Sequence, residues 1–161
     1  MLILTLMDGD DMKQIKRYML LLLTSSLMGC SLWQQTEEKI EKVGVATSDD
    51  EIPIVVEITL LNDKITQINI DEKNARSFDG TITGSKKELG DQYNMRPYSS
   101  IGKEWNEQIE VLETYIEENG IDAVMIDEEG YITNDDLKME CTIEVDDYLE
   151  VTYEAIKNAT E

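Results

Sequence analysis

Histidine is absent from this sequence, and cysteine and positive charge are scarce. Without histidine the chain has no Ser-His-Asp or Cys-His catalytic set, no His-ligated zinc and no histidine proton shuttle. Two cysteines are too few for a disulfide framework or a four-thiolate metal site. Lys and Arg number 14 against 35 Asp and Glu, and the formal charge of −21 repels a nucleic-acid backbone. We therefore expect neither a metal centre nor a nucleic-acid partner.

The 161 residues, 41% of them hydrophobic, correspond to about one domain preceded by an export signal. Lys13, Lys16 and Arg17 stand before an apolar run at 19–29 that ends at Cys30. A basic region followed by a short apolar run is typical of a secretory signal, and this run is too short to span a bilayer stably. Three aspartates precede the basic region, so Met12 is the expected start of translation.

The stretch Leu27-Met28-Gly29-Cys30 resembles a lipobox, the site where bacterial lipoproteins are cleaved and the new N-terminal cysteine receives acyl chains such as palmitate. The alternatives are an N-terminal membrane anchor and an ordinary signal with a coincidental cysteine. The resemblance implies a signal peptide at 1–29, lipidation of Cys30 and a polar tether at 30–43. It also implies a cell-membrane location on the extracytoplasmic face, with the acidic body held off the anionic surface.

Hydrophobic patterning predicts a β-hairpin in the first half of the body. Ile54–Leu61 is rich in β-branched residues, and Ile65–Ile70 alternates between polar and apolar residues. Asn62-Asp63-Lys64 between them suits a tight turn, because Asn and Asp tolerate left-handed backbone. We also expect a short strand at 80–84 and a loop or short helical turn at 86–98.

Two helices are expected in the second half. Ser99 and Ser100 can cap one that begins near Ile101 and stops at Asn119-Gly120. A brief strand at Cys141–Val145 precedes the last helix, which Asp146 or Asp147 caps and which buries Leu149, Val151, Tyr153, Ile156 and Ala159. The sequence thus predicts an α+β domain at 44–161, with a small antiparallel sheet packed against two or more helices.

Few residues stand out as chemically special. The acidic residues between 122 and 136 lack the order of a calcium loop, so we expect a solvated acidic surface. No carboxylate pair stands out for glycoside hydrolysis. Cys141 beside Glu140 is expected to be a buried, unreactive thiol. Trp105 and Tyr93 are candidates for stacking on an aromatic ligand, and core packing is the alternative reading.

Two segments, Lys86–Met95 and Ile101–Gln108, resemble secreted bacterial proteins related to the FMN-binding domain. Residues 135–143 and the final helix are similar to the end of that domain, and the resemblance covers most of residues 43–160. It implies an FMN-binding-like fold.

In better understood relatives FMN is joined by a phosphate ester to a threonine within a short motif: Asp, two variable residues, Thr or Ser, Gly, Ala, and the acceptor. Asp136 and Thr142 match this motif, whereas Met139, Glu140 and Cys141 depart from it. The motif glycine lets the backbone approach a phosphate, and Glu140 in its neighbourhood repels one. The resemblance implies Asp136 and Thr142 as cofactor-binding residues, with non-covalent FMN or no flavin favoured over covalent attachment.

Two functions of different classes are compatible with these features. The favoured one is a cell-envelope lipoprotein with a ligand-binding or structural role and no catalysis of its own. Its partners would be the membrane, through the lipid anchor, and a flavin or another small molecule. The alternative is a flavin-carrying redox protein in extracellular electron transfer, in which the flavin supplies the chemistry.

Overall fold

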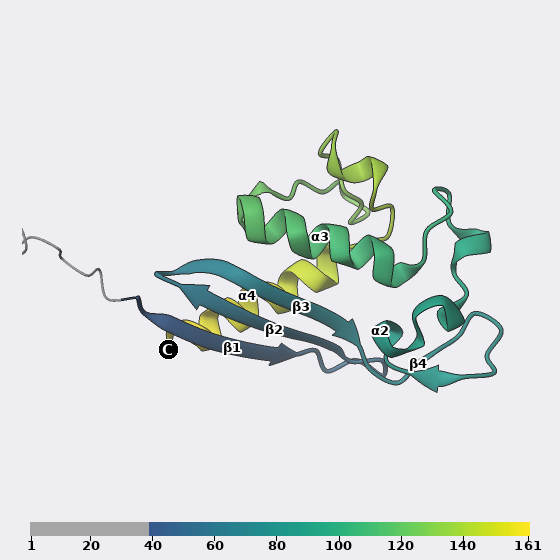
Figure 1. Ribbon diagram of the computed structural model, residues 1–161, viewed down its shortest axis with the longest axis horizontal. Helices are drawn as coiled ribbons and strands as arrows, with labels where there is room; N and C mark the ends of the chain where they lie inside the picture. Colours follow the sequence, from purple (N-terminus) through teal and green to yellow (C-terminus); the bar gives the residue numbers. More distant parts are fainter. Residues whose placement is uncertain (1–38) are drawn as a thin grey trace, which may run out of the picture. The chain divides into compact units, whose positions relative to one another are not determined.

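The computed structural model describes residues 39–161 (Figure 1). The expected signal peptide at 1–29, the lipidation site Cys30 and residues 31–38 of the tether lie outside this range. Strand β1 begins at Glu41, so residues 41–43, assigned above to the tether, belong to the folded domain. Within 39–161, no helix combines the length and the apolar character that crossing a bilayer requires.

A three-stranded antiparallel sheet forms one layer of the domain. Its strands β1 (Glu41–Thr47), β2 (Ile54–Leu61) and β3 (Lys64–Glu72) lie in the order β1-β2-β3. The predicted hairpin is confirmed. Asn62 and Asp63 both have positive φ, 52° and 61°, which is the geometry of a two-residue type I′ turn.

A β-bulge in the hairpin changes the face to which β3 residues point. Thr59 pairs with Gln67 and Leu60 pairs with Ile65, so Thr66 is the extra residue. Strict alternation would have put Ile65 on the face opposite Ile68. With the bulge, Ile65, Ile68 and Ile70 are all buried. The bulge therefore lets the whole strand contribute to one core.

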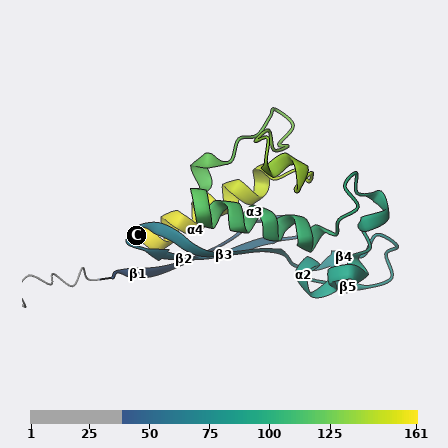
Figure 2. The ribbon, with the colours of Figure 1, turned by 45° about the horizontal axis from the view of Figure 1, so that its top comes forward.

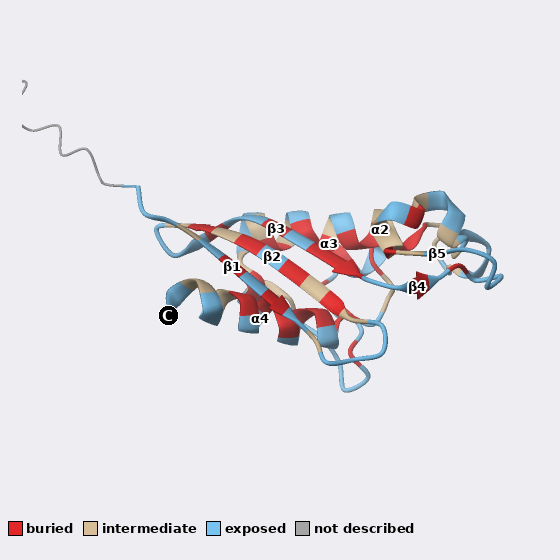
Figure 3. Cartoon of the chain, turned by 90° about the horizontal axis from the view of Figure 1, so that it is seen from below, coloured by how far each residue is buried: buried red, intermediate tan, exposed pale blue. Residues whose placement is uncertain are grey.

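Two long helices form the second layer, on one face of the sheet (Figures 1 and 2). Helix α3 (Trp105–Asn119) packs along β3, and α4 (Asp146–Thr160) packs on β1 and β2. In Figure 3 the other face of the sheet is turned to the viewer, with the helices behind it. The predicted α+β architecture, a small antiparallel sheet packed against helices, is confirmed.

Short elements fill the rest of the chain. Beyond β3, a small hairpin pairs β4 (Ala75–Arg76) with β5 (Thr83–Gly84). Its second strand is shorter than the one predicted at 80–84, and its first lies in a segment that showed no strand pattern. The segment predicted as loop or short helical turn contains α2 (Lys86–Leu89), η1 (Gly90–Tyr93) and η2 (Arg96–Tyr98). Single 3-10 turns η3 (Ile121–Ala123) and η4 (Leu137–Met139) lie between α3 and α4.

Helix α3 begins four residues later than predicted, because a buried carboxylate rather than a serine caps it. Glu104 is only 2% exposed and forms a capping box with Glu107. The same carboxylate accepts the backbone N–H groups of Met95 at 2.8 Å and Arg96 at 3.0 Å. Because Glu104 ties the preceding loop to the helix start, residues 99–103 cannot join the helix. The predicted stop at Gly120 is confirmed.

Helix α4 differs from its prediction at its cap and in its buried face. Val145, with no capping side chain, precedes the helix, and the strand expected at Cys141–Val145 is replaced by an isolated bridge between Tyr131 and Glu144. Tyr153 was expected inside but is 48% exposed, and its hydroxyl donates to Asp122 at 2.7 Å. Leu149 and Val151 are buried as predicted, together with Tyr148, Thr152 and Ala155, whereas Ile156 and Ala159 are only partly buried.

Gly44 on β1 gives a test of how closely α4 packs on the sheet. A Cβ at this position would lie 2.0 Å from the carbonyl oxygen of Ala155 and 2.8 Å from the Cβ of Ala159. We expect Gly44→Ala to lower the free energy of unfolding by about 3 kcal/mol, the upper end for overpacking, because a helix backbone must move. Denaturant unfolding followed by circular dichroism measures it. Val43→Ala, on the exposed face of the same strand, is the control; equal losses in both variants would contradict the packing.

Candidate functional site

The four residues predicted as site residues fall in three places. Trp105 and Tyr93 lie together around Lys86, Thr142 contacts Gln108, and Asp136 lines a hollow on α3. Among the described residues, no hydrogen bond or ring contact joins Trp105 or Tyr93 to Asp136 or Thr142. The structure therefore does not assemble the four into a single site, and each place is described in turn.

A buried polar network surrounds Trp105, the first residue of α3. Its indole Nε1 donates to the Tyr148 hydroxyl at 3.1 Å, and Tyr148 in turn donates to the Glu72 carboxylate. Lys86 forms an ion pair of 2.6 Å with the same carboxylate. The ammonium of Lys86 also lies 5.1 Å from the ring centroids of both Tyr93 and Trp105. The lysine thus satisfies a buried carboxylate and two aromatic faces at once.

Burial determines the chemical state of this network. Desolvation raises the pKa of Tyr148 far above its ordinary value, and the charge of Glu72 beside it adds to the effect. The phenol stays protonated and remains a donor to Glu72. Trp105 is 1% exposed, so its ring is part of the core and has no open face for a ligand. The network joins β3, α2, α3 and α4.

A second ion pair, between a buried carboxylate and a half-buried lysine, joins α3 to the outer edge of β3. Glu113 forms an ion pair of 2.5 Å with Lys87 and accepts the N–H of Ile70 at 2.5 Å. Burial raises the pKa of Glu113, and the hydrogen bonds from Lys87 and Ile70 only partly oppose that rise. One turn later, Glu117 accepts the N–H of Ile68 at 3.0 Å. Carboxylates of α3 therefore occupy backbone donors that a neighbouring strand would otherwise take.

Asp71 secures the end of β3 beside this pair. Burial is the largest influence on its pKa and raises it, but hydrogen bonds from Lys73, Ser85 and the Lys87 backbone together outweigh burial and hold the pKa below its usual value. Lys73 Nζ lies 2.7 Å from one carboxylate oxygen and Lys87 N lies 3.0 Å from the other. Asp71 is therefore a charged structural residue in the folded protein.

Thr142 is held by a glutamine that is completely buried. The backbone N–H of Thr142 donates to Gln108 Oε1 at 2.8 Å. The Thr142 hydroxyl lies 3.2 Å from the same oxygen and 3.4 Å from the Ser100 hydroxyl. Nearby, Glu140 forms an ion pair with Lys103. Burial raises the pKa of the Cys141 thiol to about 11, so that it stays protonated, as the prediction of a buried, unreactive thiol requires.

The segment around Thr142 does not fit the phosphate of a flavin. Such a group needs free backbone N–H donors and little negative charge. Here the N–H groups of Glu140 and Cys141 both donate to the Leu137 carbonyl at 3.0 Å, and that of Leu137 donates to Asp136 at 2.9 Å. Thr142 N–H is taken by Gln108, and residues 135–144 carry four carboxylates against one lysine. Both the donors and the electrostatics are wrong for an anion.

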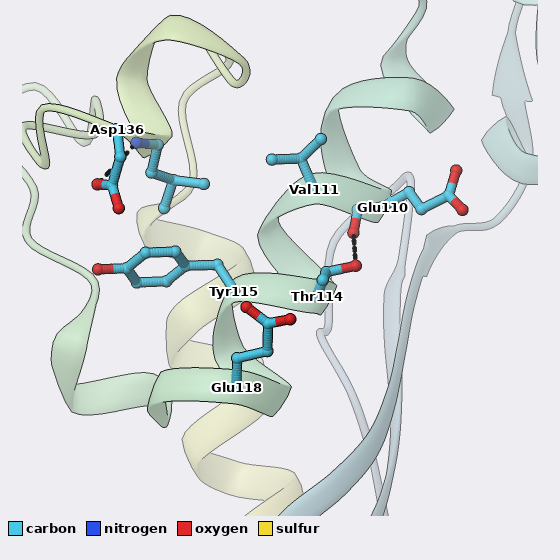
Figure 4. Close-up of a pocket in the computed structure, with 7 residues that line it drawn as sticks. Glu110, Val111, Thr114, Tyr115, Glu118 and Asp136 are labelled. Atoms are coloured by element: carbon cyan, nitrogen blue, oxygen red, sulfur yellow. Dashed lines mark hydrogen bonds between the residues drawn. The ribbon is translucent and has the colours of Figure 1, made fainter.

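Asp136 borders a hollow of about 390 Å³ on the outer side of α3, which we call the α3 hollow (Figure 4). Its floor is made by Val111, Thr114 and Tyr115 of α3 together with the buried Leu137. Three exposed carboxylates border it: those of Glu110, Glu118 and Asp136. In Figure 4, Glu110 and Asp136 lie on opposite sides of the apolar floor, and Glu118 lies one helical turn beyond Tyr115.

The carboxylates of the α3 hollow are not neutralised by cations of the described chain. None of the three lies within 4.0 Å of a Lys or Arg nitrogen in residues 39–161. The two lysines of the neighbouring segment are already paired, Lys103 with Glu140 and Lys138 with Asp135. In the same residues, no group of His, Cys, Asp and Glu is arranged to hold a metal ion. The hollow therefore offers an apolar floor inside an uncompensated negative rim.

Sequence reasoning missed the buried carboxylates Glu72 and Glu113 and the pairing of Lys86. One signal was available for α3: Gln108 and Glu113 follow the apolar positions 105 and 109 at helical spacing, so they fall on the buried side. For Lys86 no such signal exists, because its carboxylate partner Glu72 lies on β3 and its aromatic partners Tyr93 and Trp105 lie on η1 and α3.

Comparison with known proteins gives one structural likeness. The chain is similar to the solution NMR structure of a protein from Clostridium thermocellum, with 23% identity, a TM-score of 0.45, and coverage of 77% of this chain and 93% of that one. No protein-family model matches the chain, and no curated protein matches it.

Lys86→Met tests whether this lysine neutralises a buried carboxylate. Removing it leaves the carboxyl group of Glu72 without its cation in a place with little water, and we expect a loss of about 3 kcal/mol in the free energy of unfolding. Adding Glu72→Gln should restore part of that loss. Denaturant unfolding measures all three proteins. Lys138→Met, which breaks an exposed pair with Asp135, is the control and should change stability little. A loss for Lys86→Met no larger than the control would contradict the network.

Proposed function

We propose that this chain is a lipoprotein of the bacterial cell envelope that binds an elongated organic cation in the α3 hollow, without catalysis of its own. The lipid anchor at Cys30 would hold it to the membrane on the extracytoplasmic face. Support for the anchor comes from the sequence: a basic region, a short apolar run and the Leu27–Cys30 motif in the right order. Support for the ligand class comes from the hollow.

The arrangement of charge around an apolar floor carries the proposal. A neutral apolar ligand would gain no attraction from the three carboxylates, and an anion would be repelled by them. An ammonium or guanidinium group meets them with complementary charge, while a methylene chain covers Val111, Tyr115 and Leu137. The occupant that matches both features is an aliphatic amine.

The spacing of the rim favours a long ligand with more than one positive group. Glu110 and Glu118 are eight positions apart on α3, which corresponds to about 12 Å along the helix axis at 1.5 Å per residue. Asp136 supplies a third acceptor across the floor. Because exposed ion pairs contribute little each, we expect a dissociation constant on the order of 10⁻⁴ M.

A flavin-carrying role in electron transfer is supported by the family resemblance alone. The segment around Thr142 has its backbone donors occupied and carries negative charge, so its geometry argues against a phosphate ester there. The cation-binding role is favoured for this reason. The two roles are separated by adding FMN to the purified protein: we expect no bound flavin, and a mass increase equal to FMN or a yellow complex would favour the redox role.

Ligand binding is tested with spermidine, a linear polyamine, by isothermal titration calorimetry and by NMR shifts of Val111 and Tyr115. Removing two exposed ion pairs in the double variant Glu118→Gln/Asp136→Asn should weaken binding about fivefold. The control is Glu128→Gln/Glu129→Gln, which changes the net charge equally in an exposed turn. We expect that variant to bind nearly as the parent does. Equal weakening in both would mean that spermidine acts only as a counterion.

The anchor is tested by cell fractionation of a Cys30→Ser variant. Acyl chains on the cysteine would hold the protein in the membrane fraction, so the variant should move to the soluble extracytoplasmic fraction or the medium. Cys141→Ser is the matched control and should stay with the membrane. Mass spectrometry of the parent should find the N-terminus at Cys30 with added acyl mass; a parent protein with an intact leader would contradict the proposal.

A further inference from the structure

We propose that the free edge of β1 accepts an extended peptide with basic side chains as a fourth strand of the sheet. The site is independent of the α3 hollow, since it lies at β1 and α4. Figure 3 shows β1 as an outer strand of the sheet, with α4 running beside it.

The hydrogen bonds between β1 and β2 show which backbone groups of β1 face away from the sheet. Asn62 N donates to Ile40 O and Ser48 N donates to Ile54 O, each at 2.9 Å, so the even-numbered residues of this strand pair with β2. The odd-numbered residues Val43, Val45 and Thr47 consequently direct their N–H and C=O groups to the outer edge. Such a row of groups is a template for another strand.

The two edges of this sheet differ in whether their outward backbone groups are hydrogen-bonded. At the β3 edge, the outward N–H groups of Ile68 and Ile70 are taken by Glu117 and Glu113 of α3. At the β1 edge, the described residues fill one position in this way: the Asn158 side-chain amide donates to the Val45 carbonyl at 2.8 Å. The Asn158 amide makes the hydrogen bond that the N–H of an added strand would make. A rotation of this one side chain frees the Val45 carbonyl. The β1 edge is therefore open to strand addition, while the β3 edge is closed.

The surroundings of the β1 edge determine the charge of its partner. A groove of about 580 Å³, here the β1 groove, runs between residues 45–50 and α4. Five carboxylates line it, and no Lys or Arg does: Asp49, Asp50, Asp147, Glu150 and Glu154. None of the five forms an ion pair within residues 39–161. A basic strand is complementary to this groove, and a second copy of the chain, itself carrying −21, is repelled by it.

Alternation along a strand makes the partner more specific. One set of its side chains would lie over the open face of the sheet, beside Val43 and Val45, which are 63% and 48% exposed. The other set would point toward α4 and its carboxylates. The expected partner is thus an extended segment in which apolar and basic residues alternate, recognised through main-chain hydrogen bonds for affinity and side chains for specificity.

The test uses the full chain, a labelled peptide of alternating Lys and Val, and an alternating Lys-Pro peptide of equal length and charge. We expect the Lys-Val peptide to bind and to slow amide hydrogen exchange at Val43, Val45 and Thr47. The Lys-Pro peptide lacks an N–H at every second residue and should bind about a hundredfold more weakly, because several hydrogen bonds to the edge are lost. Equal binding of both peptides, or protection that omits these three amides, would overturn strand addition.

Two variants separate the backbone contribution from charge. Val45→Pro removes one outward N–H without touching the ladder to β2, and Gly44 before it has no Cβ to meet the proline ring. We expect about tenfold weaker Lys-Val binding with an unchanged circular dichroism spectrum. If this variant fails to fold, the change in hydrogen exchange at Val43, Val45 and Thr47 of the parent protein on adding the peptide still tests strand addition. The double variant Glu150→Gln/Glu154→Gln should weaken Lys-Val binding more than the control Glu128→Gln/Glu129→Gln does. Equal effects would overturn the proposal that the carboxylates of the β1 groove contact the peptide.

Self-association is measured on the same samples without peptide. Sedimentation should show a monomer, and exchange at Val43, Val45 and Thr47 should not depend on protein concentration. A dimer that protects these amides would assign the edge to a second copy and overturn the basic partner. Because spermidine binding to the α3 hollow is measured with other variants, failure of either site leaves the other standing.

Discussion

The chain has few cations, and two of them are paired with buried carboxylates. Lys86 neutralises Glu72 among Trp105 and Tyr148, and Lys87 neutralises Glu113 at the edge of β3. These pairs join the end of the hairpin to both long helices, since a carboxylate buried without its cation would strongly destabilise the domain. The same arrangement closes one edge of the sheet. The carboxylates of the α3 hollow and of the β1 groove stay unpaired because no lysine or arginine of the described residues lies beside them.

The regular parts of this fold could be predicted from sequence because they depend on local chemistry. Asn62 and Asp63 set the turn between β2 and β3, and Gly120 ends α3, as their backbone preferences require. The start of α3 could not, because Glu104 caps the helix while also holding Met95 and Arg96, a contact formed only in the folded chain. The α3 hollow could not be predicted either: the motif marked Asp136 as a flavin-binding residue, and Glu110 and Glu118 looked like ordinary exposed charge.

The resemblance to flavin carriers and the geometry of the chain lead in different directions. Gln108 and the Leu137 carbonyl take the donors that a phosphate would use near Thr142, and Trp105 lies inside the core. In their place the surface offers an apolar hollow and a strand edge, both bordered by unpaired carboxylates. We therefore propose a tethered acidic body that recognises cations, in one case as a small amine and in the other as a basic strand.

The asymmetry of the two sheet edges is the feature on which this account most depends, and residue-resolved hydrogen exchange of the free protein measures it directly. Ile68 and Ile70 should exchange slowly, because Glu117 and Glu113 hold their N–H groups. Val43, Val45 and Thr47 should exchange fast, since their N–H groups face solvent. Fast exchange at Ile68 and Ile70, or equal protection of both edges in the monomer, would contradict the account.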